Sequence, residues 1–148
     1  MFRAISKTEK EKKSMDVLIV EPEKVPRMAS ITGDLNSLQQ IVGGYIEAVY
    51  PYDDPVAIVC HEEGKLIGLP LNRKLEDYDI IAGTFIVCGL GEEDFDSLTP
   101  ELAEKYREKF ADPEIFMKMG SRIVAIPIKL KDDLHVAKPK QKSTEPEL

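Results

Sequence analysis

The sequence predicts an α+β domain with a single, mostly antiparallel sheet of five or six strands and two helices on one face of that sheet. Short apolar runs bounded by glycine, proline and acidic residues recur through the middle of the chain and indicate strands. Two other segments carry apolar residues at helical spacing between recognisable caps. With 148 residues and 43% apolar composition, the chain can form one compact core and has little room for a second.

The first predicted elements are two strands and a helix. Residues 17–20 form an apolar run that predicts the first strand, and residues 28–31 extend it or pair with it. Asp34 is a suitable N-cap for a helix over residues 35–42, whose apolar residues are spaced for one face. Gly43-Gly44 ends the helix, because glycine accepts the left-handed conformation of a C-cap.

Strands dominate the next part of the chain. Residues 45–50 alternate and predict a strand. Residues 56–60 and 66–71 predict a hairpin that turns at Gly64, where glycine allows positive φ. Residues 80–88 are the most strand-prone segment, interrupted by Gly83.

A second helix and a last strand complete the domain. Thr99 is the predicted N-cap, followed by proline at the first helical position, and Asp112-Pro113 ends the helix. Its apolar stripe predicts core packing and consists of Leu102, Tyr106 and Phe110. Residues 123–128 predict the final strand, with Pro127 favouring an edge position.

Charge separates the domain from its ends. Residues 1–14 and 129–148 are charged, poor in apolar residues and predicted to be disordered tails, which leaves residues 15–128 as the single domain. The net charge of the chain is −7, but residues 15–128 hold 10 basic and 21 acidic groups, a net charge of −11. Such an acidic body repels phosphate, so we expect no direct nucleic-acid binding.

Location follows from what the sequence lacks. No apolar run approaches the roughly 18 residues that a membrane helix needs, and the first residues lack the apolar core of a secretory signal. Cys60 and Cys88 lie in apolar strands and suit buried thiols of a reducing compartment. We therefore expect a cytoplasmic protein without membrane contact.

The segment 72–79, NRKLEDYD, is predicted to be a polar loop and the first candidate binding surface. Arg73 could form paired hydrogen bonds to a phosphate or carboxylate, with Asn72 adding an amide, Tyr78 a ring for stacking and Asp79 a carboxylate. The alternative is structural: Arg73 pairs with Asp77 or Asp79 and locks the connection. Tyr45 and Glu47, near Tyr50, form a second polar and aromatic group.

No catalytic or metal-binding pattern accompanies these residues. Cys60 and His61 are neighbours in a strand and point to opposite faces, so they form no nucleophile–base pair. The two cysteines and two histidines lack zinc-ligand spacing, and Gly89–Gly91 precedes a run of acidic residues that would repel a phosphate. We predict no catalytic residues, no metal site and no cofactor.

Several long motifs follow one another between residues 15 and 128: VEPEKVPR, LQQIVGGYIEAVYP, DDPVAIVCHEEGKLIGLPLNR, YDIIAGTFIVCGL and EDFDSLTPE. In these motifs the chain resembles an uncharacterised bacterial domain family of unknown function that is carried by phages, plasmids and conjugative elements. The resemblance implies a mobile-element setting and provides no catalytic residues to carry over.

The function we expect is non-catalytic binding in the cytoplasm by a phage or mobile-element protein. It would counteract host defence by occupying a small anionic, nucleotide-like signal or a host protein, and a homo-oligomer could bury such a ligand between subunits. One alternative is an acidic DNA mimic that occupies a nuclease or restriction enzyme. Another is an enzyme that uses the carboxylates and Arg73 in chemistry the sequence does not reveal.

Overall fold

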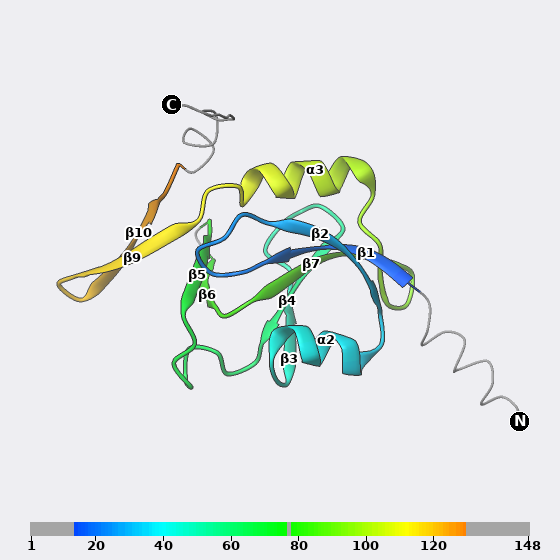
Figure 1. Cartoon of the computed structure of the whole chain (residues 1–148), viewed down its shortest axis with the longest axis horizontal. Helices are drawn as coiled ribbons and strands as arrows, with labels where there is room; N and C mark the ends of the chain where they lie inside the picture. Colours follow the sequence, from blue (N-terminus) through cyan, green and yellow to red (C-terminus); the bar gives the residue numbers. More distant parts are fainter. Residues whose placement is uncertain (1–13, 77, 130–148) are drawn as a thin grey trace, which may run out of the picture.

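The computed structural model describes residues 14–76 and 78–129, so nearly all of both predicted tails, and Asp77, lie outside the described residues. Its centre is a six-stranded antiparallel sheet in the order β2-β1-β7-β4-β3, with β8 pairing with β7 (Figure 1). The strands of this sheet are β1 (Ser14–Val20), β2 (Arg27–Thr32), β3 (Ile46–Val49), β4 (Val56–His61), β7 (Phe85–Leu90) and β8 (Phe95–Asp96).

Two hairpins and two helices complete the described chain. The hairpins are β5 (Leu71–Leu75) with β6 (Asp79–Ala82), and β9 (Glu114–Met119) with β10 (Arg122–Pro127). The helices are α2 (Leu35–Val42) and α3 (Pro100–Lys109). The predicted α+β class with mostly antiparallel strands is therefore confirmed. Neither described helix is long and apolar enough to cross a membrane.

The two helices cover opposite faces of the main sheet, so the prediction of one shared face is wrong (Figure 1). Leu18 in β1 belongs to the cluster that contains Tyr106 of α3, whereas its neighbour Ile19 packs with Leu38 of α2. Alternation along a strand sends successive side chains to opposite faces. The central strands are continuous apolar runs because both of their faces are buried, a pattern that the one-face prediction overlooked.

Three of the four predicted helix ends are confirmed, because Asp34, Gly43 and Thr99 are cap residues, although the Asp34 side chain makes no cap hydrogen bond. The fourth is wrong: α3 ends at Lys109, before Asp112-Pro113. Gly43 has φ of 92° and its N–H bonds to the carbonyl of Gln39, as a left-handed C-cap requires. Thr99 Oγ1 accepts a hydrogen bond from the Leu102 N–H at 3.2 Å, and Pro100 occupies the first turn.

The middle of the chain pairs differently from the prediction. Residues 66–71 are not the partner of β4, which lies between β3 and β7, and the predicted loop 72–79 begins as strand β5. Gly83, with φ of 85°, separates β6 from β7, so the predicted strand 80–88 is two strands. An apolar run can be divided in this way wherever a glycine takes positive φ.

The sequence predicted only the second strand of the β9–β10 hairpin. The hairpin projects away from the main sheet beyond the end of α3 (Figure 1). Its base is held by the Lys74 N–H, which donates to Glu114 Oε1, and by an ion pair of Lys129 with Asp112. β9 was missed because lysine and methionine weaken the strand signal of its alternation.

Candidate functional site

A cleft of about 300 Å³ lies between the main sheet and the β5–β6 hairpin. β3 and β4 supply one side, the turn that follows β4 supplies the end, and β6 with the residue before it supplies the other side. Three of the six predicted site residues meet here: Glu47, Tyr78 and Asp79. Glu47 lies more than 30 residues before Tyr78 and Asp79 in sequence, so only the fold brings the two predicted groups together.

The floor of the cleft is apolar and its rim is acidic. Val49, Cys60 and Ile81 are buried members of the core beneath α3 and also line the cleft. Four exposed carboxylates surround them, and one lysine, Lys65, is the cationic side chain that the lining contains. The acidic rim residues are Glu47, Glu62, Glu63 and Asp79.

The polar groups of the rim are partly fixed by one another. Lys65 Nζ donates to Asp79 Oδ1 at 2.6 Å, and the same oxygen accepts the N–H of Ile80 at 2.8 Å. His61 Nδ1 accepts the N–H of Glu63 at 3.0 Å, which leaves the proton of a neutral ring on Nε2. Among the described residues, the carboxylates of Glu47, Glu62 and Glu63 form no ion pair.

Cys60 lines the cleft as a protonated thiol. Burial, together with the nearby carboxylates of Glu47 and Asp79, raises its pKa to about 11. Its thiol donates to the carbonyl of Glu47 at 3.7 Å, whereas the His61 ring bonds to the Glu63 amide. Because these two side chains have different partners and the thiolate is the nucleophilic form of cysteine, the pair is not arranged for nucleophilic catalysis.

Asn72 and Arg73 face the interior of the domain. Both side chains are fully buried in β5, on strand positions that the sequence predicted as loop. The Arg73 guanidinium donates to the carbonyls of Phe110 (2.9 Å) and Lys24 (2.7 Å) and to Asn72 Oδ1 (2.9 Å). The predicted structural pairing of Arg73 with Asp79 is wrong, because that carboxylate pairs with Lys65. Asp77 lies outside the described residues.

Tyr45 and Tyr50 stand at the two ends of β3, the edge strand of the main sheet. Their side chains are exposed, with 74% of Tyr45 accessible to solvent. The carbonyl of Tyr45 accepts the Glu62 N–H at 2.9 Å, so its backbone adjoins the rim although its ring is not part of the lining. Tyr45 therefore flanks the cleft.

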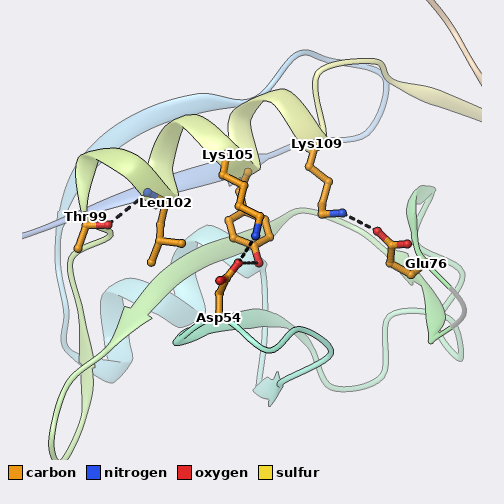
Figure 2. Close-up of polar contacts among 7 residues, drawn as sticks. Asp54, Glu76, Thr99, Leu102, Lys105 and Lys109 are labelled. Carbon is orange, nitrogen blue, oxygen red and sulfur yellow. Dashed lines mark hydrogen bonds and ion pairs between the residues drawn. The ribbon is translucent and has the colours of Figure 1, made fainter.

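A second polar group fastens α3 to the domain (Figure 2). Asp54 Oδ2 accepts bonds from Lys105 Nζ (2.6 Å) and the Tyr106 hydroxyl (2.7 Å), and Lys109 pairs with Glu76. The bond from Lys105, then that from Tyr106, lowers the pKa of Asp54. These contacts satisfy one another and join α3 to the segments before β4 and after β5, which is a structural role.

Sequence reasoning missed His61 and Lys65 as cleft residues, because it treated residues 61–65 as an ordinary hairpin turn. The density of charge there, HEEGK, was the available signal. Among residues 14–76 and 78–129, no group of three or more His, Cys, Asp or Glu side chains is arranged to hold a metal ion.

The sequence of the domain matches a known family model. The model of the DUF3846 family, described as a domain of unknown function, matches residues 15–111, about two thirds of the chain. No curated protein and no solved structure matches the chain. The matched segment contains the main sheet, both helices and every residue of the cleft, and it ends before the β9–β10 hairpin. The chain belongs to the DUF3846 family.

Proposed function

We propose that this protein is a non-catalytic binding protein whose cleft takes a cationic group, an amine or a guanidinium, attached to an apolar part. One observation carries the proposal: a single cleft of about 300 Å³ combines an apolar floor with four rim carboxylates and one lysine. That volume is at the lower end for ligand pockets, and it suits a small amine or one side chain of a partner protein.

The charge of the rim supports a cation over an anion. Lys65 is already paired with Asp79, so the unpaired charges described at the rim are the carboxylates of Glu47, Glu62 and Glu63. A cation that enters would form charge-assisted hydrogen bonds there, which are stronger than neutral ones. Tyr78, 55% exposed at the rim, offers a ring face for a cation–π contact.

This proposal revises the chemistry of the expected ligand. A nucleotide-like signal would need Arg73 and Asn72 for its phosphates, and both side chains are fully buried. A cation can be presented by a small metabolite or by a lysine or arginine of a host protein. The setting we propose is a mobile-element protein that occupies a host component in the cytoplasm, which rests on the motif resemblance alone.

Calorimetric titration of the full chain tests the proposal. Agmatine, spermidine and N-acetyl-arginine amide are the cationic probes, and ATP is the anionic one. We expect at least one cationic probe to bind, with affinity that falls as salt is raised, and ATP not to bind. Glu47→Gln should weaken the cation at least tenfold, since an interaction with a charged group contributes about 1.5–3 kcal/mol.

The matched control is Glu92→Gln, which removes an exposed carboxylate from a turn outside the cleft lining and should leave the affinity unchanged. Binding of ATP with no binding of the amines would contradict the proposal, as would equal losses in the two variants. Turnover of a bound probe, abolished by a cleft substitution, would contradict the non-catalytic part.

A further inference from the structure

The β9–β10 hairpin carries an exposed apolar face. Residues that pair across antiparallel strands lie on the same face, so Ile115 with Ile126, Met117 with Val124, and Met119 with Arg122 share one side. Four of these are exposed large hydrophobic residues, and Met119, at 58%, is the most accessible of the four. A two-stranded hairpin with an uncovered apolar face is marginally stable in water.

We propose that this hairpin face docks on the cleft surface of a second copy of the chain, with Arg122 as the cation that enters the cleft. The inference rests on the proposed function, because it uses the preference of the cleft for a cation beside apolar groups. It adds the identity of one partner and a consequence for regulation: copies of the protein compete with any other cationic ligand.

Charge complementarity selects the body of another copy as the partner. Residues 15–111 hold eight basic and 19 acidic groups, a net charge of −11, whereas residues 114–127 hold two basic groups and one acidic group. Lys118 and Arg122 lie close to the turn of the hairpin, which places the positive charge at its tip. A basic tip is attracted to an acidic rim and repelled by another basic tip.

The apolar residues of the hairpin and those of the cleft are also complementary. The cleft combines a buried apolar floor with exposed apolar side chains at its rim, above all Leu66 at 81% and Tyr78 at 55%. The hairpin offers Met117 and Met119 beside Arg122, and methionine adapts to irregular apolar surfaces. The hairpin projects away from its own domain, so the cleft that it meets belongs to another molecule (Figure 1).

Contact between two different surfaces is heterologous, so it produces either a closed ring or an open chain of molecules. Sedimentation velocity of the full chain across micromolar to submillimolar concentrations tests this. We expect association that grows with concentration and weakens with salt. Arg122→Glu and, separately, Glu62→Lys with Glu63→Lys should each weaken association at least tenfold. Lys24→Glu, an exposed charge reversal outside both surfaces, should not.

Mixing the two weakened variants provides the decisive result. The Arg122→Glu hairpin should bind the Glu62→Lys, Glu63→Lys cleft and restore mixed assemblies, because the charges at that contact are reversed together. Arg122→Gln serves as the milder hairpin variant, and circular dichroism establishes that every variant is folded. A free amine that binds the cleft should dissociate the assemblies.

Other outcomes overturn the inference. A protein that stays monomeric at every concentration contradicts it, and so does association that the hairpin variant abolishes but the cleft variant leaves intact, since the hairpins would then pack on each other. Amine binding without self-association would remove this inference and leave the proposed function standing. Absence of amine binding alongside cleft-dependent association would remove the small-cation function instead.

Discussion

Arg73 is the largest fully buried side chain of the described chain, and its hydrogen bonds go to neutral oxygens. Burial lowers the pKa of its guanidinium, with Glu114 and Asp112 opposing that shift, but an arginine stays protonated in proteins. Arg73→Ala would leave a cavity and would deprive the carbonyls of Phe110 and Lys24 of their hydrogen-bond donor. We expect a loss of about 3–5 kcal/mol in the free energy of unfolding, measured with urea.

Lys74, the next residue, provides the control because its side chain is exposed. Lys74→Ala should change stability by no more than about 0.5 kcal/mol. Folded Arg73→Ala should still bind a cationic probe with wild-type affinity. A stable Arg73→Ala variant that loses ligand binding would return Arg73 to the functional site.

Tyr106 of α3 and Tyr52, which packs against it, allow the contribution of a buried tyrosine hydroxyl to be compared with and without a hydrogen-bond partner. The rings of Tyr52 and Tyr106 lie 5.2 Å apart, but the buried Tyr52 hydroxyl has no hydrogen-bond partner among the described residues, whereas that of Tyr106 bonds to Asp54. Tyr52→Phe should therefore be neutral or stabilising, and Tyr106→Phe should cost about 0.5–1.5 kcal/mol. Thermal unfolding of both variants measures the difference, and equal losses would contradict this account.

At the scale of elements, the sequence predicted those features that depend on residues close together in the chain. The caps at Gly43 and Thr99 and the runs that became β1, β4 and β10 follow from residues close in sequence. The pairing of β4 with β7 did not follow, because these strands are distant in sequence and no turn residue encodes their contact. The two predicted groups of cleft residues were not connected for the same reason: Glu47 and Tyr78 meet because the β5–β6 hairpin lies beside β3 and β4, with which it does not pair.

Gly89 is an element-scale constraint where β7 meets β8. A Cβ at this position would lie against the carbonyl oxygen of Ser97 and 3.1 Å from its carbonyl carbon, and backbone atoms cannot rotate away. Gly89→Ala should therefore displace β8 and cost about 1–3 kcal/mol. Hydrogen exchange should become faster at the Leu98 amide, which bonds to the carbonyl of Asp16. Leu90→Ala, at an exposed neighbouring position, should leave that exchange rate unchanged.

At the scale of the whole molecule, two buried thiols make the free energy of unfolding fall as the pH becomes alkaline. Burial raises the pKa of Cys60 to about 11 and that of Cys88 to about 12, from an ordinary value near 9. Above pH 9 the unfolded chain releases protons that the folded chain retains, so the free energy of unfolding falls as pH rises. Below pH 9 the thiols contribute no pH dependence, because they are protonated in both states.

Urea unfolding at pH 8 and pH 10 tests this whole-molecule effect. The wild type should lose about 2–3 kcal/mol between the two values, since each thiol contributes about 1.4 kcal/mol in total, most of it above pH 9. The Cys60→Ala, Cys88→Ala double variant should lose much less, even if it is less stable at both values. Parallel losses in the two proteins would show that other groups cause the decline.

The order of strands also governs how the chain can reach its native state. β1 is the first of the described strands to be made, yet in the centre of the sheet it pairs with β7, where Ile19 stands opposite Ile86. Two hairpin-like units, β1–β2 and β3–β4, precede β7 in the chain, and a growing chain could form each of them early. Joining these units requires β7, and closing so long a loop is entropically costly before its contacts exist. On the ribosome, the sheet therefore cannot close until residues 85–90 have emerged.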